Sequence, residues 1–437
     1  MLMEKLNAMN GRPCLCGKVH SFDAEVYVGN AIIKKIPDYI RKYAPKKVFL
    51  LSDQNTWNAA GKQVSDVLHS SGIQCTSYRF THFPVEPDEY SVGAAVMHFD
   101  STCDLIIGIG SGVINDIGKI LSKLSGKPYM IVATAPSMDG YASASSSMTR
   151  SGLKISLPSR SADIIVGDTQ ILCQAPLHMM KSGLGDMIAK YVSICEWRIA
   201  ELVTEEYFCP QIAQLVRQSL KRCIDNAQGL LKRDETAVQA VFEGLVICGV
   251  AMNYAGLSRP ASGVEHYISH VLDMRGVEFG TPVELHGIQC AVGTLIAARL
   301  YEKLKATTPD KEKALSYASN FSYDHWAQTL RAFLGKGAES MIALEEKERK
   351  YDLDAHRQRL EIILKNWDKI LDIINQELPA SQELETLLDT LEAPKSLESI
   401  GLDAHILPTV IKATKDIRDK YVLSRLAWDL GILDELV

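Results

Sequence analysis

The sequence predicts two domains, an N-terminal α/β domain with a Rossmann-like parallel sheet and an all-helical C-terminal domain. Its 437 residues are more than one ordinary hydrophobic core accommodates. Short apolar strands alternate with helical stretches in the first third of the chain, and long helical periodicities replace them after about residue 175. We therefore expect residues 1–178 to form the α/β domain and residues 179–437 to form the helical domain.

The expected parallel sheet rests on apolar runs that are separated by helical patterns. The run from Lys47 to Leu51 is typical of a buried strand, and the run after Asp104 is continuously apolar. Strands that are joined by helices run parallel, with helices covering both faces of the sheet. The pattern predicts strands over residues 47–51, 74–80, 104–109 and 129–133, and helices over residues 57–69, 90–99 and 114–124.

The expected helical domain follows from long stretches of helical periodicity, among which strand-like runs nearly vanish. The stretch 354–376 is charged and amphipathic, which is typical of a solvated helix on the outside of a domain. The other periodic stretches span residues 209–232, 235–254 and 289–304.

Composition and charge argue against several classes of protein. The net charge of -6 disfavours binding to nucleic acid or to a membrane surface, because both partners select basic proteins. We expect no membrane-spanning segment and no secretory signal, since the N-terminus carries Glu4 and no long apolar core. The ten cysteines are scattered singly, as in a reduced cytosolic protein. We therefore expect a cytoplasmic protein.

A glycine-rich loop follows the predicted strand 104–109 and opens the next helix. Glycines let the backbone approach a diphosphate, and the first turn of a helix offers N–H donors and a partial positive charge. The third glycine comes earlier than in the common G-x-G-x-x-G fingerprint, so a plain strand-to-helix turn is the alternative. The loop reads Gly108-Ile109-Gly110-Ser111-Gly112-Val113-Ile114-Asn115-Asp116.

Two further features lie at the carboxyl ends of predicted strands, where parallel sheets bind ligands. Asp53 can accept the ribose hydroxyls of NAD, or it can cap the helix that follows. A carboxylate there repels the 2′-phosphate of NADP, which favours NAD without excluding NADP. The second feature is a loop of small hydroxyl residues with one acid, Thr134-Ala135-Pro136-Ser137-Met138-Asp139-Gly140-Tyr141-Ala142-Ser143.

Residues that suit a divalent metal ion occur in three stretches of the helical half. Asp186 lies just inside an apparent helix start, and His286 begins a later helix. His266 and His270 lie one turn apart on one helix face. One carboxylate with two or three imidazoles suits Zn²⁺, Ni²⁺ or Fe²⁺. The residues alone assign both His266 and His270 to the metal, although a single histidine is more often structural.

A second candidate metal cluster lies near the N-terminus, where Cys14, Cys16 and His20 form a C-x-C-x3-H run. Thiolates and imidazoles are ligands that zinc prefers. A fourth ligand is missing and the spacing is not that of a common zinc finger, so a turn with buried thiols is the alternative.

Several of these motifs, taken jointly, are specific to one family, although each alone is not. They span about residues 25–300 and comprise Gly110 to Asp116, Thr134 to Ser143, Gly152-Leu153-Lys154, Gly185 to Lys190, and the positions of His266, His270 and His286. With these motifs the chain resembles the bacterial glycerol-1-phosphate dehydrogenases. That family belongs to the superfamily of glycerol dehydrogenases, iron-containing alcohol dehydrogenases and dehydroquinate synthases.

The resemblance implies a dehydroquinate synthase-like architecture, with the active site in the cleft between an α/β and a helical domain. It places Asp139 and His270 at the substrate, which replaces the assignment of His270 to the metal. It makes Asp186, His266 and His286 the ligands of one divalent ion, with Zn²⁺ or Ni²⁺ favoured over Fe²⁺. It implies that NAD or NADP is held by Gly112, Val113, Ile114, Asn115, Asp116, Thr134, Ala135, Pro136, Ser137 and Ser143.

The implied reaction is the reversible reduction of dihydroxyacetone phosphate to sn-glycerol 1-phosphate, which would supply a phospholipid or cell-surface precursor. Two details favour the glycerol or glycerol-phosphate branch of the superfamily. A dehydroquinate synthase usually has glutamate at the position of Asp186, and an iron-containing alcohol dehydrogenase usually has histidine at the position of Lys190. Lys154 is the first candidate to hold the substrate phosphate, with Arg150 and Arg160 nearby in sequence.

Three alternatives stay open. A glycerol dehydrogenase or another polyol dehydrogenase would not require the phosphate, and a dehydroquinate synthase-like lyase would cause no net change in NADH. A non-catalytic protein with the same fold is disfavoured by the intact set of ligands and loops. We expect a homodimer or a higher homo-oligomer, because most soluble oligomers are symmetric assemblies of one chain.

Overall fold

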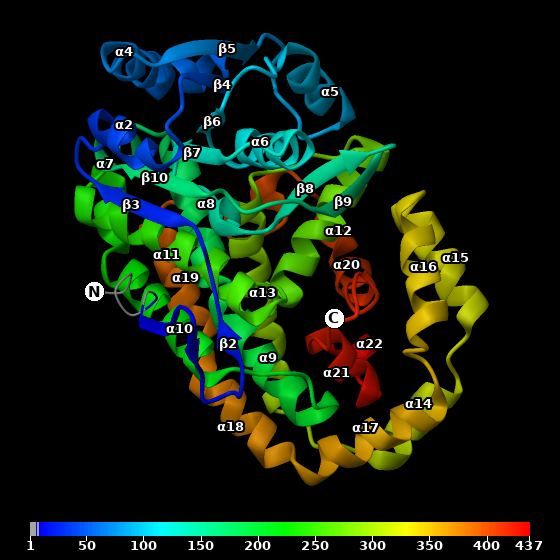
Figure 1. The fold of residues 1–437 in the computed structure, drawn as a ribbon. Helices are drawn as coiled ribbons and strands as arrows, with labels where there is room; N and C mark the ends of the chain where they lie inside the picture. Colours follow the sequence, from blue (N-terminus) through cyan, green and yellow to red (C-terminus); the bar gives the residue numbers. More distant parts are fainter. Residues whose placement is uncertain (1–5, 7) are drawn as a thin grey trace. The chain divides into compact units, whose positions relative to one another are not determined.

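The computed structural model describes residue 6 and residues 8–437, and the chain forms two compact units (Figure 1). The first unit comprises Met1–Met187 and Gln214–Leu257, and the second comprises Ile188–Ala213 and Ser258–Val437. This division differs from the single boundary near residue 178 expected from sequence, because the helical segment Gln214–Leu257 groups with the sheet.

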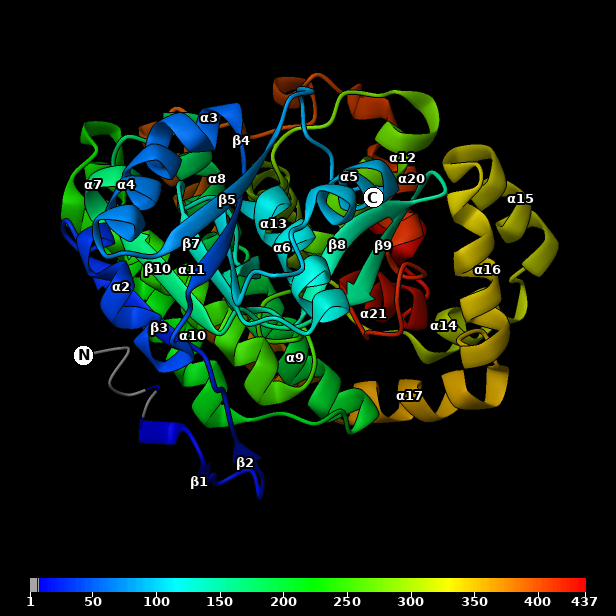
Figure 2. The same cartoon turned by 45° about the horizontal axis from the view of Figure 1, so that its top comes forward.

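The first unit is built on a parallel sheet, as predicted. The sheet has six strands in the order β3-β10-β7-β6-β4-β5. The bounds of β5 and β7 match the predicted strands, whereas β3 and β10 were not predicted. Two antiparallel ribbons, β1–β2 and β8–β9, were also not predicted, and the second of them lies against α6 (Figure 2). The strands are β1 Arg12–Pro13, β2 Val19–His20, β3 Glu25–Gly29, β4 Lys47–Asp53, β5 Gln74–Phe80, β6 Leu105–Gly110, β7 Tyr129–Ala133, β8 Ser145–Arg150, β9 Leu153–Pro158 and β10 Ile164–Asp168.

Helices cover both faces of this sheet. Alternate strand residues such as Val48 pack with Ile33 and Ile36 from one side, and each such side chain contributes about 1.5–3 kcal/mol on burial. Phe49 faces the other side and meets Phe99 at a ring-centroid distance of 5.2 Å. The helices are η1 Ile33–Lys35, α2 Ile36–Tyr39, η2 Arg41–Tyr43, α3 Gln54–Thr56, η3 Trp57–Gly61, α4 Lys62–Ser70, α5 Glu89–His98, α6 Gly112–Ser125, η4 Gly140–Ala142, α7 Thr169–Leu172, α8 Leu177–Ile188, α10 Pro210–Asp225, η5 Ala227–Lys232 and α11 Glu235–Ala255.

The direction in which the strands are added reverses between β4 and β6. The chain continues from β4 to β5 on one side and from β6 to β7 on the other. At such a switch point the two following connections diverge and leave a crevice in which parallel sheets bind ligands. The strands that flank this crevice end at Asp53 and Gly110. Asp53 and the glycine-rich loop, two of the cofactor elements predicted from sequence, therefore lie at the switch point.

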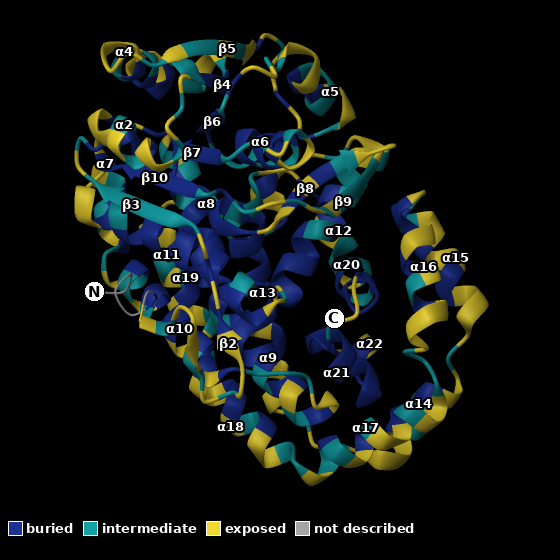
Figure 3. Cartoon of the chain, in the orientation of Figure 1, coloured by how far each residue is buried: buried dark blue, intermediate teal, exposed yellow. Residues whose placement is uncertain are grey.

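The helix α11 is the one in the described part of the chain with the length and apolar composition to cross a membrane. Of the residues in its most apolar stretch, 78% are buried in the structure, and Figure 3 shows the helix mostly in dark blue. It packs against η4, η5, α7 and β3 of the first unit. These contacts are those of a core helix, which passes the same compositional test.

The second unit consists of helices around one large apolar core. The predicted helix 354–376 is two helices, because the chain bends at Asn366, whose φ and ψ are -115° and 19°. Figure 3 shows exposed residues along the outer helices α15 to α18. The helices are α9 Lys190–Thr204, α12 Val264–Phe279, α13 His286–Lys305, α14 Lys311–Ser319, α15 Tyr323–Leu334, α16 Gly337–Glu348, α17 Leu353–Lys365, α18 Trp367–Glu377, α19 Ser381–Thr390, η6 Glu398–Ile400, η7 Ala404–Ile406, α20 Leu407–Thr414, α21 Leu423–Asp429 and α22 Leu433–Leu436.

A buried carboxylate, Asp416, joins three parts of the second unit. It accepts hydrogen bonds from Trp326 Nε1 at 2.8 Å, from the Tyr351 hydroxyl at 2.7 Å and from Lys415 Nζ at 2.7 Å. Burial alone would raise its pKa, but the Lys415 ammonium and the hydrogen bonds hold the pKa of Asp416 below its usual value. The folded state therefore favours the charged carboxylate.

Replacing Asp416 with asparagine should lower the free energy of unfolding at pH 7 by about 3–5 kcal/mol, because Lys415 is left buried without its counter-ion. Since the folded pKa is lowered, the wild-type contribution is present above the unfolded pKa of about 3.9 and is lost as the pH falls through the folded value. Urea unfolding from pH 7 to pH 3 measures both effects. The exposed Asp372→Asn is the control, and equal stability of the two variants would contradict the role of Asp416.

Candidate functional site

The glycine-rich loop joins β6 to α6 at the switch point. A Cβ on Gly110 would lie 2.6 Å from Ile114, so glycine lets the helix begin directly against the strand. The Ser111 side chain does not cap α6. The first N–H groups of α6, at Gly112, Val113 and Ile114, have no acceptor inside the helix and can bind an anion.

Side chains of α6 hold the second loop, which spans residues 134–143. Asn115 Nδ2 donates to Gly140 O at 3.1 Å, and Lys119 Nζ donates to Ser143 Oγ at 3.2 Å. Lys119 also pairs with Asp116 at 2.9 Å. Asn115, Asp116 and Ser143 therefore all have partners within the unit, while Asn115 Oδ1 is buried with no hydrogen-bond partner among the described residues.

The helix α8 holds the second loop from another side. A Cβ on Gly183 would lie 1.8 Å from Pro136 O, so only glycine allows this approach. The Asp139 N–H donates to Asp186 Oδ2 at 2.8 Å, and Asp186 is fully buried. Asp186 lies in the last turn of α8 (Leu177–Ile188) and not near a helix start, because the helical pattern begins earlier than the sequence indicated.

Two predicted metal ligands and one additional residue meet in the second unit. Ligand atoms of His266, His286 and Cys290 lie within 4.8 Å of one another, with Cys290 Sγ 3.6 Å from His286 Nε2. His266 Nδ1 lies 2.7 Å from Glu265 Oε1, and His286 Nδ1 lies 3.1 Å from Ser269 Oγ. A carboxylate only accepts, so His266 Nδ1 carries the hydrogen and its Nε2 offers the lone pair.

This arrangement fits a metal ion, because metal-binding imidazoles are commonly held through their other nitrogen by a carboxylate or another polar group. Glu196 lies near Glu265, with a carboxylate oxygen of each close to Gly263. Burial and the neighbouring Glu265 carboxylate raise the pKa of Glu196, whereas backbone N–H groups of Leu423 and Val264 that donate to it act in the opposite direction. The net shift disfavours a second negative charge beside Glu265.

The sequence reasoning missed Cys290, although a signal for it was present. Cys290 follows His286 by four residues on α13, which is the same spacing that drew attention to His266 and His270 on α12. His270 is half-buried and stacks on His286 with ring centroids 6.1 Å apart. The group of ligand atoms around His266 does not include His270.

Asp53 acts as the cap of α3 (Gln54–Thr56), which was the structural alternative for this residue. Its Oδ1 accepts from the Thr56 N–H at 2.8 Å, and the Asp53 N–H donates to Thr56 Oγ1 at 3.0 Å. This capping box fixes the direction of the chain after β4 and leaves the carboxylate half-buried at the switch point.

The candidate phosphate ligands lie on and near the β8–β9 ribbon. Lys154 is half-buried on β9 opposite Thr149, next to a turn in which Ser151 and Gly152 have φ angles of +53° and +73°. These angles are those of a tight two-residue hairpin turn. Arg160 forms an ion pair with Asp163, which directly precedes β10. The Asp163 carboxylate therefore already neutralises the Arg160 charge. Lys154 remains the better candidate of the two.

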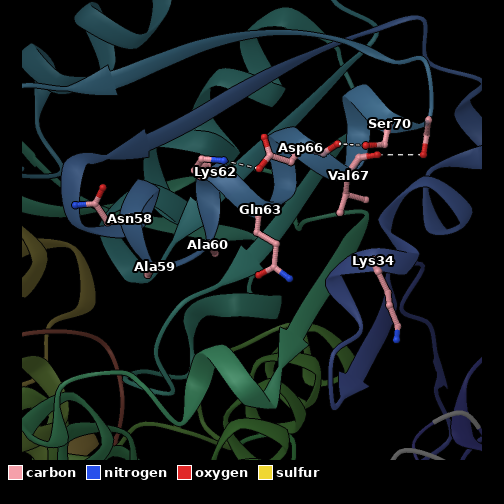
Figure 4. Close-up of a pocket in the computed structure, with 10 residues that line it drawn as sticks. Lys34, Asn58, Ala59, Ala60, Lys62, Gln63, Asp66, Val67 and Ser70 are labelled. Atoms are coloured by element: carbon pink, nitrogen blue, oxygen red, sulfur yellow. Dashed lines mark hydrogen bonds and ion pairs between the residues drawn. The ribbon is translucent and has the colours of Figure 1, made fainter.

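A surface hollow of the first unit, with a volume of 580 Å³, lies along α4 (Figure 4). Lys34 of η1, residues Asn58 to Ala60 and the outer face of α4 line it, and Lys62 pairs with Asp66 at 2.7 Å across one turn of α4. None of the sequence-predicted site residues lines this hollow, so it carries no part of the candidate site.

Comparisons with known proteins show the family of the chain. The model of the iron-containing alcohol dehydrogenase family matches residues 27–176. Glycerol-1-phosphate dehydrogenase [NAD(P)+] of Halalkalibacterium halodurans is 30% identical over 294 residues, which are 66% of this chain and 74% of that protein. The enzyme of the same name from Methanosarcina barkeri is 33% identical over 278 residues, with 63% and 76% covered. The chain belongs to the glycerol-1-phosphate dehydrogenase family.

Solved structures of other proteins show the same fold. Maleylacetate reductase from a Rhizobium species superposes with a TM-score of 0.61 at 14% identity, covering 95% of this chain and 96% of that one. Glycerol dehydrogenase from Schizosaccharomyces pombe superposes with a TM-score of 0.58 at 18% identity, covering 95% and 92%. Both the family resemblance and the fold class predicted from sequence are confirmed.

Substituting Gly183 with alanine should destabilise the first unit by about 1–3 kcal/mol, since the added methyl group meets a backbone oxygen that has little room to move. The matched control is Gly93→Ala in the middle of α5, where a Cβ meets nothing within 4 Å and helix propensity improves. Thermal unfolding followed by circular dichroism compares the variants. A Gly183→Ala protein as stable as Gly93→Ala would disprove the close approach.

Proposed function

We propose that this protein is a metal-dependent dehydrogenase that reversibly reduces dihydroxyacetone phosphate to sn-glycerol 1-phosphate with NADH or NADPH. One observation carries the proposal. The imidazoles of His266 and His286 are oriented by Glu265 and Ser269 in a chain that belongs to this family. The cofactor loops at the switch point support the same reaction. A polyol dehydrogenase without a phosphate requirement is the competing reading, and the Lys154 experiment below separates the two.

We assign the metal ion to Asp186, His266 and His286. A divalent ion in this set acts as a Lewis acid on a substrate carbonyl oxygen. The Cys290 sulfur beside His286 Nε2 softens the donor set, which supports Zn²⁺ or Ni²⁺ over harder ions such as Mg²⁺. Glu265 and Ser269 fix the orientation of the two imidazoles, so that each ligand is in place before an ion arrives.

We assign the nicotinamide cofactor to the loops after β6 and β7. The diphosphate would lie against the N–H groups that open α6, and the carboxylate of Asp53 would accept the ribose hydroxyls, which favours NAD. The buried, unpartnered Oδ1 of Asn115 supports a polar ligand at this point. The remaining contacts come from Asp116, Thr134 to Ser137, and Ser143.

Three residues would serve the substrate. His270 holds or passes a proton to the substrate oxygen, directly or through water. Asp139 faces the substrate from the second loop, where its backbone bond to Asp186 fixes its position. Lys154 holds the phosphate as a point charge, while the surrounding groups exclude bulk water.

We further propose a cytoplasmic homo-oligomer whose product is a precursor of phospholipid or of a cell-surface polymer. The thiol-containing clusters support a reducing compartment, because their ligands must stay reduced. The net charge of -6 disfavours stable association with an anionic membrane surface.

Chelator-treated protein should lose the oxidation of NADH by dihydroxyacetone phosphate, and Zn²⁺ or Ni²⁺ should restore it. His266→Ala should lower activity by more than about 100-fold with any added ion. Loss of a residue that only hydrogen-bonds to a metal ligand already lowers metal affinity or activity about 10- to 100-fold. Absorbance at about 340 nm follows the reaction. The exposed His69→Ala is the control, and full activity of metal-free His266→Ala would refute the assignment.

Lys154→Met should raise the KM for dihydroxyacetone phosphate by about 10- to 100-fold, because a hydrogen bond to a charged group is worth about 1.5–3 kcal/mol. The KM for unphosphorylated dihydroxyacetone should not change. Arg160→Met is the control, since Arg160 already pairs with Asp163. If both substrates react equally well with the wild-type protein, the function is that of a polyol dehydrogenase.

A further inference from the structure

The N-terminal hairpin, which consists of β1, β2 and the turn between them, gathers three metal-binding side chains. Cys14 and Cys16 lie in the turn, and His20 ends β2. The turn is closed by hydrogen bonds from the Cys14 N–H to Lys18 O at 2.8 Å and from the Gly17 N–H to Cys14 O at 2.9 Å. Two sulfur atoms and one imidazole nitrogen thereby lie within 4.8 Å of one another.

The separation of these atoms fits one zinc ion. With bonds of about 2.0–2.3 Å in a tetrahedron, two ligands of one zinc ion lie about 3.3–3.8 Å apart. Cys16 Sγ lies 3.3 Å from His20 Nε2. A thiol–imidazole hydrogen bond would explain that single contact, but it would not explain why Cys14 belongs to the same group.

His20 is held in the manner of a metal-binding histidine. Its Nδ1 lies 2.8 Å from the carbonyl oxygen of Tyr254 at the end of α11, and its side chain is buried. A carbonyl oxygen only accepts, so Nδ1 carries the hydrogen and Nε2 presents its lone pair beside the sulfur of Cys16. The ring also stacks on Tyr254 at a centroid distance of 5.5 Å.

The hairpin has little apolar contact to hold it. Each of its strands has two residues, and Leu15 and Val19 are 90% and 61% exposed. Ribbons of this size usually need a disulfide or a metal ion, because they cannot bury a core of their own. A bound ion would supply that cross-link.

We propose that Cys14, Cys16 and His20 bind a structural zinc ion. Two thiolates and one imidazole are ligands that zinc prefers, and a structural zinc ion completes its tetrahedron with a fourth ligand. Each thiol releases its proton to solvent as it binds, so the affinity falls at low pH. This zinc is a second ion per chain, and none of its ligands belongs to the set proposed for catalysis.

The first test measures zinc per chain in the His266→Ala background, in which the proposed catalytic ion is absent. This protein should keep about one zinc per chain after dialysis against zinc-free buffer, because a structural zinc ion is tightly bound. Adding Cys16→Ser should abolish that zinc, whereas adding Cys75→Ser, a half-buried thiol on β5, should leave it. Elemental mass spectrometry gives the content, and circular dichroism verifies that each variant is folded.

The second test uses Co²⁺ in the same background, because thiolate-to-cobalt charge transfer reports sulfur ligands without any assay of activity. The near-ultraviolet band should fall by about half in Cys14→Ser and in Cys16→Ser, since each removes one of the two thiolates of the hairpin. An unchanged band in Cys14→Ser would overturn the place of Cys14 among the ligands.

Two other results would overturn the site as a whole. One is equal zinc in the His266→Ala protein with and without Cys16→Ser. The other is a mass two hydrogens below the reduced value without bound zinc, which would show that Cys14 and Cys16 form a disulfide. The reaction with dihydroxyacetone phosphate enters neither test, so failure of the zinc site and failure of the proposed function remain distinct.

Discussion

The hydrogen bond from the Asp139 N–H to the Asp186 carboxylate ties the second loop of the sheet to the helix that bears a proposed metal ligand. Its length of 2.8 Å depends on the close approach of α8 to the loop at Gly183. Lys119 and Asn253 fasten the same loop from α6 and α11. A loop held from several sides loses little further entropy when a ligand binds, and this preorganisation is what a catalytic site requires.

The two candidate metal clusters follow one chemical pattern in different parts of the chain. In each, a histidine is held through Nδ1 by the protein, and its Nε2 lies beside a cysteine sulfur, at 3.6 Å for His286 and 3.3 Å for His20. The chemistry differs in the remaining donors. A carboxylate and a second imidazole suit an ion that must also bind substrate, whereas additional thiolates suit an ion that only cross-links.

Much of the sheet was predictable from sequence, because its central strands are short continuous apolar runs that helical stretches separate. β5 and β7 match the expected bounds, while the edge strand β3 and the strand β10 were missed, since short runs near glycine do not stand out from loops. Candidate residues for the site could be named from motifs. Cys290 could not, because a lone thiol becomes a candidate ligand only when the fold brings other donors such as His266 and His286 to it.

The grouping of Gln214–Leu257 with the sheet has a consequence for how the chain is made. The sheet strands are complete by Asp168, but Gly167 packs against Phe242 of α11, so the core of the first unit closes only after that helix exists. At about 5–20 residues per second, translation from residue 187 to residue 257 takes roughly 4 to 14 s. During that interval the nascent sheet exposes an apolar face, and a chaperone that binds such surfaces has time to act before Ser258–Val437 of the second unit is synthesised.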